Sequence, residues 1–275
     1  MKITADDFDL KNTLDSGQFF GFNPLSGSMF EMNVGEYAFR IRQTKNVLYL
    51  QGVEGEEVRK KLGEFFDLSR DLSGLYALLN ADQKLKPLLR LRGLRILKQD
   101  PWEAIASFII SSNNNIKRIQ HLWKQLADSI GKKKGVFPSC DEVSRSSPNF
   151  LRKLGLGYRA EYLHETARQI AENPSLLESA GKLSYPEARE IFMKFPGIGP
   201  KVADCILLFG YQFFESFPVD VWIEKIMRDL YFRDSDIPSG QLGDEARKKW
   251  GKWAGYVQQY LFHGSRKGIL TIKKD

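Results

Sequence analysis

Lys201 is the residue of this chain best placed to act as a nucleophile. It directly follows the glycine-rich stretch 195–200 and begins an apolar helix that the pattern predicts over residues 201–209. Because the positive end of a helix dipole disfavours an ammonium, this position favours the neutral amine. A neutral lysine amine can attack an electrophilic carbon and form a Schiff base. Taken alone, a solvated lysine at a helix end is the simpler interpretation.

Asp220, 19 residues after Lys201, is the candidate partner. It follows an extended segment stiffened by Pro218 and precedes a new helix, so an ordinary N-cap explains it well. Capping and catalysis are compatible, since hydrogen bonds from helix N–H groups favour the ionised carboxylate. Such a carboxylate could stabilise positive charge that develops on a sugar.

The stretch before Lys201 is predicted to be a tight hairpin between two helices. Gly197 and Gly199, on either side of Ile198, permit backbone geometry closed to other residues. Successive N–H groups could then point outward at the start of a helix, where a DNA phosphate would fit. A helix-connecting turn that needs glycine only for its shape explains the pattern equally well.

These residues need elements to position them, and the sequence predicts an α+β fold. Short strands broken by turns are predicted over residues 28–32, 37–42 and 47–51, which is typical of an antiparallel sheet. Helical periodicity appears at residues 58–66 and dominates from about residue 95. We therefore expect an antiparallel β-sheet domain over residues 1–94 and a mainly helical region with the active site over residues 95–275.

Two helix starts follow the same pattern. Asp100 can cap, Pro101 occupies the first helical position, and Glu103 can reach back as a capping box. Residues 184–187, Ser-Tyr-Pro-Glu, repeat this pattern before the helix that enters the hairpin.

Composition supports a globular protein with a polyanionic partner. Hydrophobic residues make up 42%, and the net charge is +7. Residues 1–93 hold 13 basic and 13 acidic side chains, whereas residues 94–275 hold 28 and 21, so the excess lies in the second part. Two distant cysteines and three scattered histidines argue against a disulfide framework, a metal or an iron–sulfur cluster. We expect no cofactor, no membrane segment and an intracellular location.

The hairpin and the segment around Asp220 resemble the helix-hairpin-helix DNA glycosylase superfamily. Residues 195–204, Phe-Pro-Gly-Ile-Gly-Pro-Lys-Val-Ala-Asp, carry the resemblance together with residues 218–220. Within that superfamily the chain is most similar to the 8-oxoguanine DNA glycosylase/lyases, and the similarity extends over most of its length. Further matching segments are residues 16–20, 111–119, 154–160 and 258–262.

The resemblance implies an enzyme of base excision repair that extrudes the damaged nucleotide from the duplex. Lys201 would attack C1′ of the sugar, displace the oxidised base and leave a Schiff base able to eliminate the 3′ phosphate. Asp220 would stabilise the charge.

The resemblance also implies the residues of a damaged-base pocket. Phe262 and Cys205 would lie on opposite faces of the base, and Gln258 would bond its Watson–Crick edge. The carbonyl of Gly17 would accept the N7–H that oxidised guanine has and guanine lacks. From the residues alone, Cys205 and Phe262 are ordinary core residues and Gly17 is a plain turn glycine.

On the opposite strand, the resemblance implies that Asn113, Arg118 and Arg159 read the cytosine while Tyr158 wedges into the base stack. A polar loop and a surface charge are the simpler alternatives for Asn113 and Arg159. The implied partner is double-stranded DNA containing oxidised guanine, bound by a monomer. The protein would act in the nucleus of a eukaryote or in the cytoplasm and nucleoid of a bacterium or archaeon.

Two departures from the eukaryotic pattern affect lesion selection. Trp222 stands where those members usually carry histidine, and residues 263–265, His-Gly-Ser, replace Ser-Ala-Asp. Three alternatives stay open: a related glycosylase for other lesions, a non-enzymatic helix-hairpin-helix DNA-binding module, and a basic interaction protein. The first would usually carry a four-cysteine cluster or lack the lysine, and the second would need neither Lys201 nor Asp220.

Overall fold

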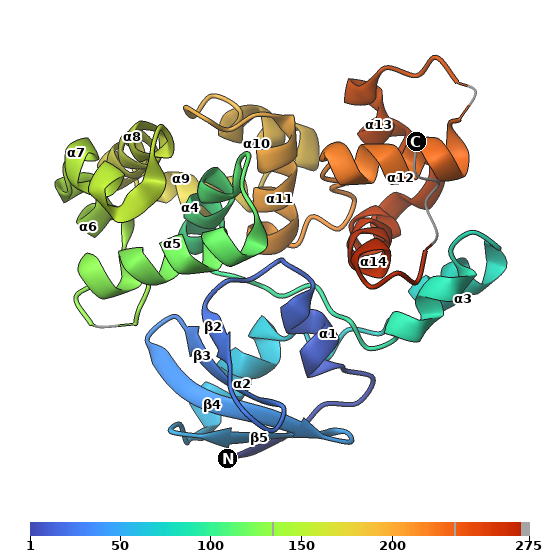
Figure 1. Ribbon diagram of the computed structural model, residues 1–275, viewed down its shortest axis with the longest axis horizontal. Helices are drawn as coiled ribbons and strands as arrows, with labels where there is room; N and C mark the ends of the chain where they lie inside the picture. The colour runs from blue at the N-terminus through green and yellow to red at the C-terminus, as the bar shows by residue number, and fades with distance from the viewer. Residues whose placement is uncertain (134, 234, 271–275) are drawn as a thin grey trace.

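The computed structural model describes residues 1–133, 135–233 and 235–270, and it confirms the predicted α+β fold. An antiparallel sheet lies at one end, and helices fill the rest of the molecule (Figure 1). The strand order is β1-β5-β4-β3-β2. The strands are β1 (Lys2–Thr4), β2 (Phe22–Pro24), β3 (Met29–Val34), β4 (Tyr37–Thr44) and β5 (Val47–Gln51).

The three predicted strands correspond to β3, β4 and β5, whereas β1 and β2 were not predicted. The central strands bury every second residue, as in β3, where Phe30, Met32 and Val34 face the core. β1 and β2 have three residues each and pair only at the sheet edges, so they are too short to show this alternation.

Helices dominate the chain after the sheet, as predicted. The α-helices are α1 (Leu10–Asp15), α2 (Glu56–Phe65), α3 (Ser73–Ala81), α4 (Pro101–Ser111), α5 (Ile116–Ser129), α6 (Cys140–Arg145), α7 (Pro148–Leu151), α8 (Arg159–Glu172), α9 (Ser175–Ala180), α10 (Tyr185–Phe192), α11 (Pro200–Tyr211), α12 (Val221–Tyr231), α13 (Leu242–Trp250) and α14 (Ala254–Arg266). Among the described residues, no helix combines the length and the apolar character needed to cross a membrane.

The buried apolar side chains form two clusters. One lies between the sheet and helices α1 and α2, and the larger one joins the helices of the second part. Buried residues from Leu72 onward, including those of α3, belong mainly to the larger cluster, although Leu97 returns to the sheet. The boundary that the sequence predicts between residues 94 and 95 stays a prediction.

The cap of α4 is as expected, but the capping box is not. The Asp100 side chain accepts a hydrogen bond from the Glu103 backbone N–H at 3.0 Å. The Glu103 side chain does not reach back, because it is buried and accepts a hydrogen bond from Trp123 Nε1 at 3.0 Å. Burial, with a smaller contribution from the neighbouring Asp100 carboxylate, raises the pKa of Glu103 to about 8.

We expect the stability of this protein to depend on pH through Glu103. Because the folded-state pKa lies above the unfolded value, the stabilising contribution is complete below the unfolded value and is lost as pH rises towards 8. Glu103→Gln removes the titration but keeps an oxygen for Trp123. As pH rises from 5 to 8, the free energy of unfolding of the variant should therefore increase relative to that of the wild type by on the order of 3 kcal/mol.

Urea unfolding at pH 5, 6.5 and 8 measures this difference. Glu54→Gln, at an exposed position, serves as the control and should follow the wild type at each pH. Parallel stability curves for Glu103→Gln and the wild type would show that Glu103 does not carry the pH dependence.

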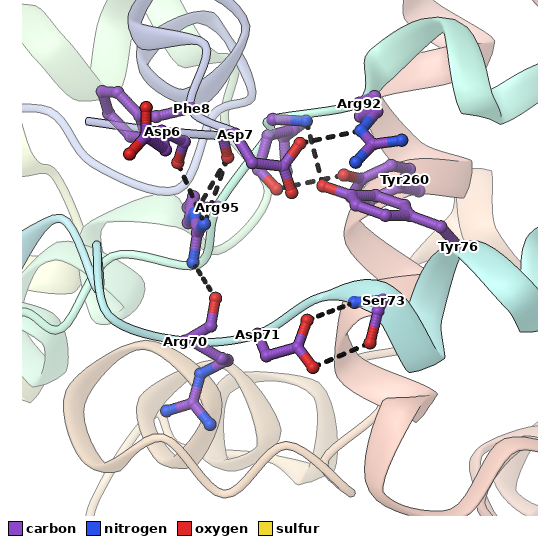
Figure 2. A network of polar contacts seen from close by, with 12 residues as sticks. Asp6, Asp7, Phe8, Arg70, Asp71, Ser73, Tyr76, Arg92, Arg95 and Tyr260 are labelled. Carbon is purple, nitrogen blue, oxygen red and sulfur yellow. Dashed lines mark hydrogen bonds and ion pairs between the residues drawn. The ribbon is translucent and has the colours of Figure 1, made fainter. Parts of the chain in front are cut away.

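Arg95 joins the N-terminal segment to the chain that leaves α2. Its buried guanidinium donates hydrogen bonds from Nη1 to the carbonyl oxygens of Asp67 and Arg70, at 2.8 and 2.6 Å. Nη2 donates to the Asp7 carbonyl oxygen at 3.1 Å (Figure 2). Beside this group, the hydroxyl of Tyr260 on α14 donates to the Leu94 carbonyl oxygen at 3.1 Å. The sheet domain and α14 are therefore fixed to the same stretch of backbone.

Candidate functional site

Lys201 lies in the first turn of α11, as the sequence predicts, although the helix begins one residue earlier, at Pro200, and extends to Tyr211. Its Nζ donates a hydrogen bond to Ser111 Oγ at 3.3 Å and lies 5.5 Å from the centre of the Phe108 ring. Both partners belong to α4. The two helices approach closely at Gly210, where an added Cβ would lie only 3.2 Å from Ala104 Cβ. The amine is thus half-buried between α11 and the end of α4.

A buried acidic residue fixes α11 to α10, the other helix of the hairpin. Asp204 Oδ1 accepts hydrogen bonds from the Tyr185 hydroxyl at 2.6 Å and from Arg189 Nε at 2.8 Å. Burial raises the pKa of Asp204, and the Arg189 guanidinium opposes this shift. The charge pair therefore holds α11 in a set orientation towards α10.

Cys205 lies one turn after Lys201 and is buried. Burial raises the pKa of its thiol to about 11, and the Lys201 ammonium opposes the shift. At neutral pH the thiol is protonated, so Cys205 is not a thiolate nucleophile. The Asp220 carboxylate acts on the pKa of this thiol in the same direction as burial.

Asp220 is the N-cap of α12, as predicted. Its Oδ1 accepts hydrogen bonds from the backbone N–H groups of Trp222 at 3.1 Å and Ile223 at 2.8 Å. Val221 and Trp222, the first residues of the helix, are 77% and 62% exposed. Two large apolar side chains beside a charged site are typical of a surface that a partner covers.

Helix α14 carries the two predicted base contacts. Gln258 is buried, and its side-chain oxygen has no hydrogen-bond partner among the described residues. A buried amide oxygen without a partner is costly, so this atom is suited to accept from a ligand. Phe262 is half-buried, and the Arg266 guanidinium lies 5.6 Å from the centre of its ring.

Gly17 lies in a turn that only glycine fits well. Its φ is +81°, and a Cβ there would lie 2.8 Å from Ile116 Cδ1 and 3.5 Å from Arg266 Nη1. These contacts place the turn between the start of α5 and the end of α14. Figure 1 shows α1, which precedes this turn, between the sheet and α14.

The residues expected to read the opposite base gather after α4. Asn113 is exposed and has a φ of +52°. Arg159 is buried, and its guanidinium donates to the carbonyl oxygens of Ser112, at 2.8 Å from Nε, and of Asn113, at 3.0 Å from Nη2. Arg159 is therefore not a solvated surface charge, and it holds the turn that presents Asn113.

Arg118 and Tyr158 lie beside that turn. Arg118 is exposed and donates from Nη2 to the Gly155 carbonyl oxygen at 3.3 Å. Tyr158 is 50% exposed and packs edge-on against Tyr162, with 6.0 Å between ring centres. Its ring also lies 4.5 Å from the Arg159 guanidinium. An exposed aromatic ring among cations is suited to contact stacked bases.

The hairpin before α11 differs in one respect from the expectation. Ile198 is buried, and its N–H donates to the Phe195 carbonyl oxygen at 3.2 Å. The interpretation that successive N–H groups all point outward is therefore wrong for Ile198, which anchors the hairpin instead. Gly199 is exposed with open space around it, whereas a Cβ at Gly197 would overlap the Tyr162 ring at 2.4 Å.

Several contacts of the site were not predicted. Ser111 and Phe108 contact Lys201, but their place depends on how α4 packs on α11, which no local pattern shows. Gln259 and Arg266 hold the turn around Gly17, and they read as ordinary polar residues of an amphipathic helix. Within the described part of the chain, no three His, Cys, Asp or Glu side chains form a group that could hold a metal ion.

Two family models match adjoining parts of the chain. Residues 1–105 match the N-terminal domain of 8-oxoguanine DNA glycosylase, and residues 106–252 match the HhH-GPD superfamily of base excision DNA repair proteins.

Similar proteins match over nearly the whole chain. A "Probable N-glycosylase/DNA lyase" of Methanothermobacter thermautotrophicus is 34% identical over 98% of this chain and 97% of its own. The N-glycosylase/DNA lyase of Saccharomyces cerevisiae is 32% identical, over 100% of this chain and 89% of its own. The 8-oxoguanine glycosylase/lyase of Clostridium acetobutylicum, solved with double-stranded DNA containing cytosine opposite 8-oxoguanine, superposes with a TM-score of 0.90 at 32% identity and 98% coverage of both chains.

Proposed function

Since this chain belongs to the 8-oxoguanine DNA glycosylase/lyases of the helix-hairpin-helix superfamily, we propose that it excises 8-oxoguanine from duplex DNA and then cleaves the strand by β-elimination. The enzyme class, a DNA glycosylase with lyase activity, follows from the family. The observation that carries the proposed mechanism is the half-buried Lys201 amine, which lies in the first turn of α11 and one helical turn before the buried Cys205.

Lys201 is the nucleophile in this mechanism. Its amine attacks C1′, the bond from C1′ to N9 breaks, and the base leaves with the bonding electrons and takes up a proton. The C1′–O4′ bond then breaks, O4′ takes up a proton, and the opened sugar is held at C1′ as a Schiff base with Lys201. Loss of a proton from C2′ forms a C2′=C3′ double bond and breaks the C3′–O bond, which releases the 3′-side strand with a 5′ phosphate. Asp220 stabilises the positive charge that develops on the sugar as the base departs.

The pocket requires the nucleotide to leave the duplex, because C1′ is not reachable within a base stack. Phe262 and Cys205 enclose the two faces of the base, and Gln258 offers its free amide oxygen to the Watson–Crick edge. The Gly17 carbonyl accepts the N7–H of oxidised guanine. Trp222, exposed at the start of α12, is covered by the bound DNA.

The duplex is held on the surface between the hairpin and α8. Gly197 and Gly199 approach a phosphate, Asn113 and Arg118 contact the cytosine left behind, and Tyr158 fills the gap in the stack. The basic excess of residues 94–275 supplies affinity that does not depend on sequence. We propose that the protein binds DNA in this way as a monomer. It would do so in the nucleus of a eukaryote or in the cytoplasm and nucleoid of a bacterium or archaeon.

Borohydride trapping tests the proposal. A duplex with 8-oxoguanine opposite cytosine should give a covalent complex with the wild-type protein, because borohydride reduces a Schiff base to a stable amine. Trapping repeated with the four opposite bases and with other lesions gives the specificity. No trapped complex on the 8-oxoguanine duplex would contradict the proposed mechanism.

Arg159→Ala is expected to lower the preference for cytosine opposite the lesion about tenfold, because it releases the turn that presents Asn113. Binding to undamaged DNA should change less than about twofold, since buried Arg159 contributes little to phosphate contacts. Single-turnover excision with each opposite base measures the preference. Arg152→Ala, an exposed neighbour, is the control. Equal losses of preference and binding would reduce Arg159 to a phosphate contact.

A further inference from the structure

We propose that Gln259 and Arg266 of α14 are positioning residues for the carbonyl oxygen of Gly17. They hold the turn around Gly17 so that this oxygen stays within reach of a base bound against Gln258 and Phe262. The inference rests on the proposed function, because it concerns how oxidised guanine is distinguished from guanine.

One face of α14 binds the segment that leads into Gly17. Residues 259, 263 and 266 are spaced by four and three, so they lie on the same side of the helix. Gln259 Nε2 donates to the Ser16 carbonyl oxygen at 3.1 Å, and Arg266 Nη1 donates to the Asp15 carbonyl oxygen at 3.0 Å. Between them, His263 Nε2 lies 3.2 Å from Asn12 Oδ1.

The neighbouring face of the same helix carries the predicted base contacts. Gln258 and Phe262 are also four residues apart, and each directly precedes a residue of the holding face. Arg266 connects the two faces, because it lies close to both Gly17 and the Phe262 ring. A single rigid helix therefore sets the distance between the Gly17 turn and the base.

The backbone carbonyl oxygens of the residues on either side of Gly17 both accept hydrogen bonds. The Ser16 oxygen accepts from Gln259, and the Gln18 oxygen accepts from Gln99 Nε2 at 2.6 Å. Within the described residues, the Gly17 oxygen itself accepts no hydrogen bond. The turn thus leaves one acceptor free while its neighbours fix it in place.

This arrangement suits recognition of a single hydrogen atom. Oxidised guanine carries a hydrogen on N7, whereas guanine has a lone pair there, so a fixed carbonyl oxygen attracts the first and repels the second. Hydrogen bonds weaken steeply with distance and misalignment, so a loose turn would lose this selectivity. Gln259 is only 2% exposed, so water does not compete for the hydrogen bond that its amide donates to the Ser16 carbonyl oxygen.

Gln259→Met tests the inference, because it keeps the shape of the side chain and removes the donor. Two single-turnover rates are compared: excision of 8-oxoguanine opposite cytosine, and strand cleavage at a preformed abasic site opposite cytosine. We expect excision to fall about tenfold, which corresponds to about 1.4 kcal/mol. Abasic cleavage should stay within about twofold, since no base needs the Gly17 oxygen there.

Tyr260→Phe is the matched control. It removes a buried donor from the same helix, but that donor bonds the Leu94 carbonyl oxygen rather than the Gly17 turn. It should lower the melting temperature and leave the ratio of the two rates unchanged. Equal losses of both rates in Gln259→Met, or an equally changed ratio in Tyr260→Phe, would overturn the inference.

Arg266 allows a second test with two variants. Because its side chain is exposed, substituting it does not disturb the buried core. Arg266→Met should lower excision relative to abasic cleavage about threefold or more, and Arg266→Lys should restore part of the loss. If the wild type excises 8-oxoguanine and both Arg266→Met and Gln259→Met keep its ratio of excision to abasic cleavage, the inference is overturned but the proposed function is not. A wild type that cleaves abasic sites but never excises 8-oxoguanine would overturn the proposed function as well.

Discussion

Lys201→Gln is expected to yield no borohydride-trapped complex and to excise 8-oxoguanine at least about a thousandfold more slowly than the wild type. An amide has no basic lone pair with which to attack C1′ or to form a Schiff base. The glutamine can still bond Ser111, so the packing of α11 on α4 should persist. Trapping and single-turnover excision on the 8-oxoguanine duplex measure the effect, and a thermal melt checks the fold.

Lys2→Gln is the matched control for this experiment. Lys2 is an exposed lysine of β1, which is an edge strand of the sheet. The N-terminus of the chain lies at the sheet end of the molecule, away from α11 (Figure 1). It loses the same charge and should trap like the wild type. An undiminished trapped band with Lys201→Gln would overturn the assignment of the nucleophile.

Asp220→Asn is expected to lower the rate of excision about 100-fold to 1,000-fold, with a small effect on binding of the intact duplex. The substitution removes the negative charge but keeps an oxygen that can accept from Trp222 and Ile223, so the cap of α12 survives. Asparagine is as good an N-cap as aspartate, and stability should change by less than about 1 kcal/mol. The experiment therefore separates the charge of Asp220 from its structural role.

Single-turnover excision and urea unfolding measure the two effects. Asp100→Asn applies the same change to the cap of α4, and excision should stay close to the wild-type rate. If Asp220→Asn excises at the wild-type rate, or loses activity only in proportion to lost stability, then Asp220 is an N-cap and nothing more.

Much of the local structure around the candidate site could be predicted because it depends on residues close in the sequence. Proline and glycine mark the start of α11, which fixes Lys201 in the first turn. The aspartate before α12 is an N-cap by type and by position, and the structure places it so. The central strands alternate buried and exposed residues, which predicted β3, β4 and β5 from their spacing.

What could not be predicted depends on contacts between distant segments. Glu103 had the spacing of a capping box, but Trp123, 20 residues away, supplies a buried donor that it prefers. The hydrogen bond from Gln259 to Ser16 spans 243 residues, and nothing in either segment indicates it. Ile198 looked like part of an open phosphate loop, yet its apolar side chain is buried and its N–H is used within the turn.

The two buried arginines have a consequence for how this protein tolerates change. Arg95 and Arg159 donate to main-chain carbonyl oxygens, which every amino acid carries. Their hydrogen bonds therefore restrict the path of the chain and not the identity of the residues along it. Position 112 can exchange its side chain without weakening the bonds that it accepts from Arg159, whereas positions 95 and 159 have no equivalent substitute, because lysine lacks the planar fork of donors. The scaffold of the site is thus encoded at a few donor positions, and the acceptor segments are free to vary.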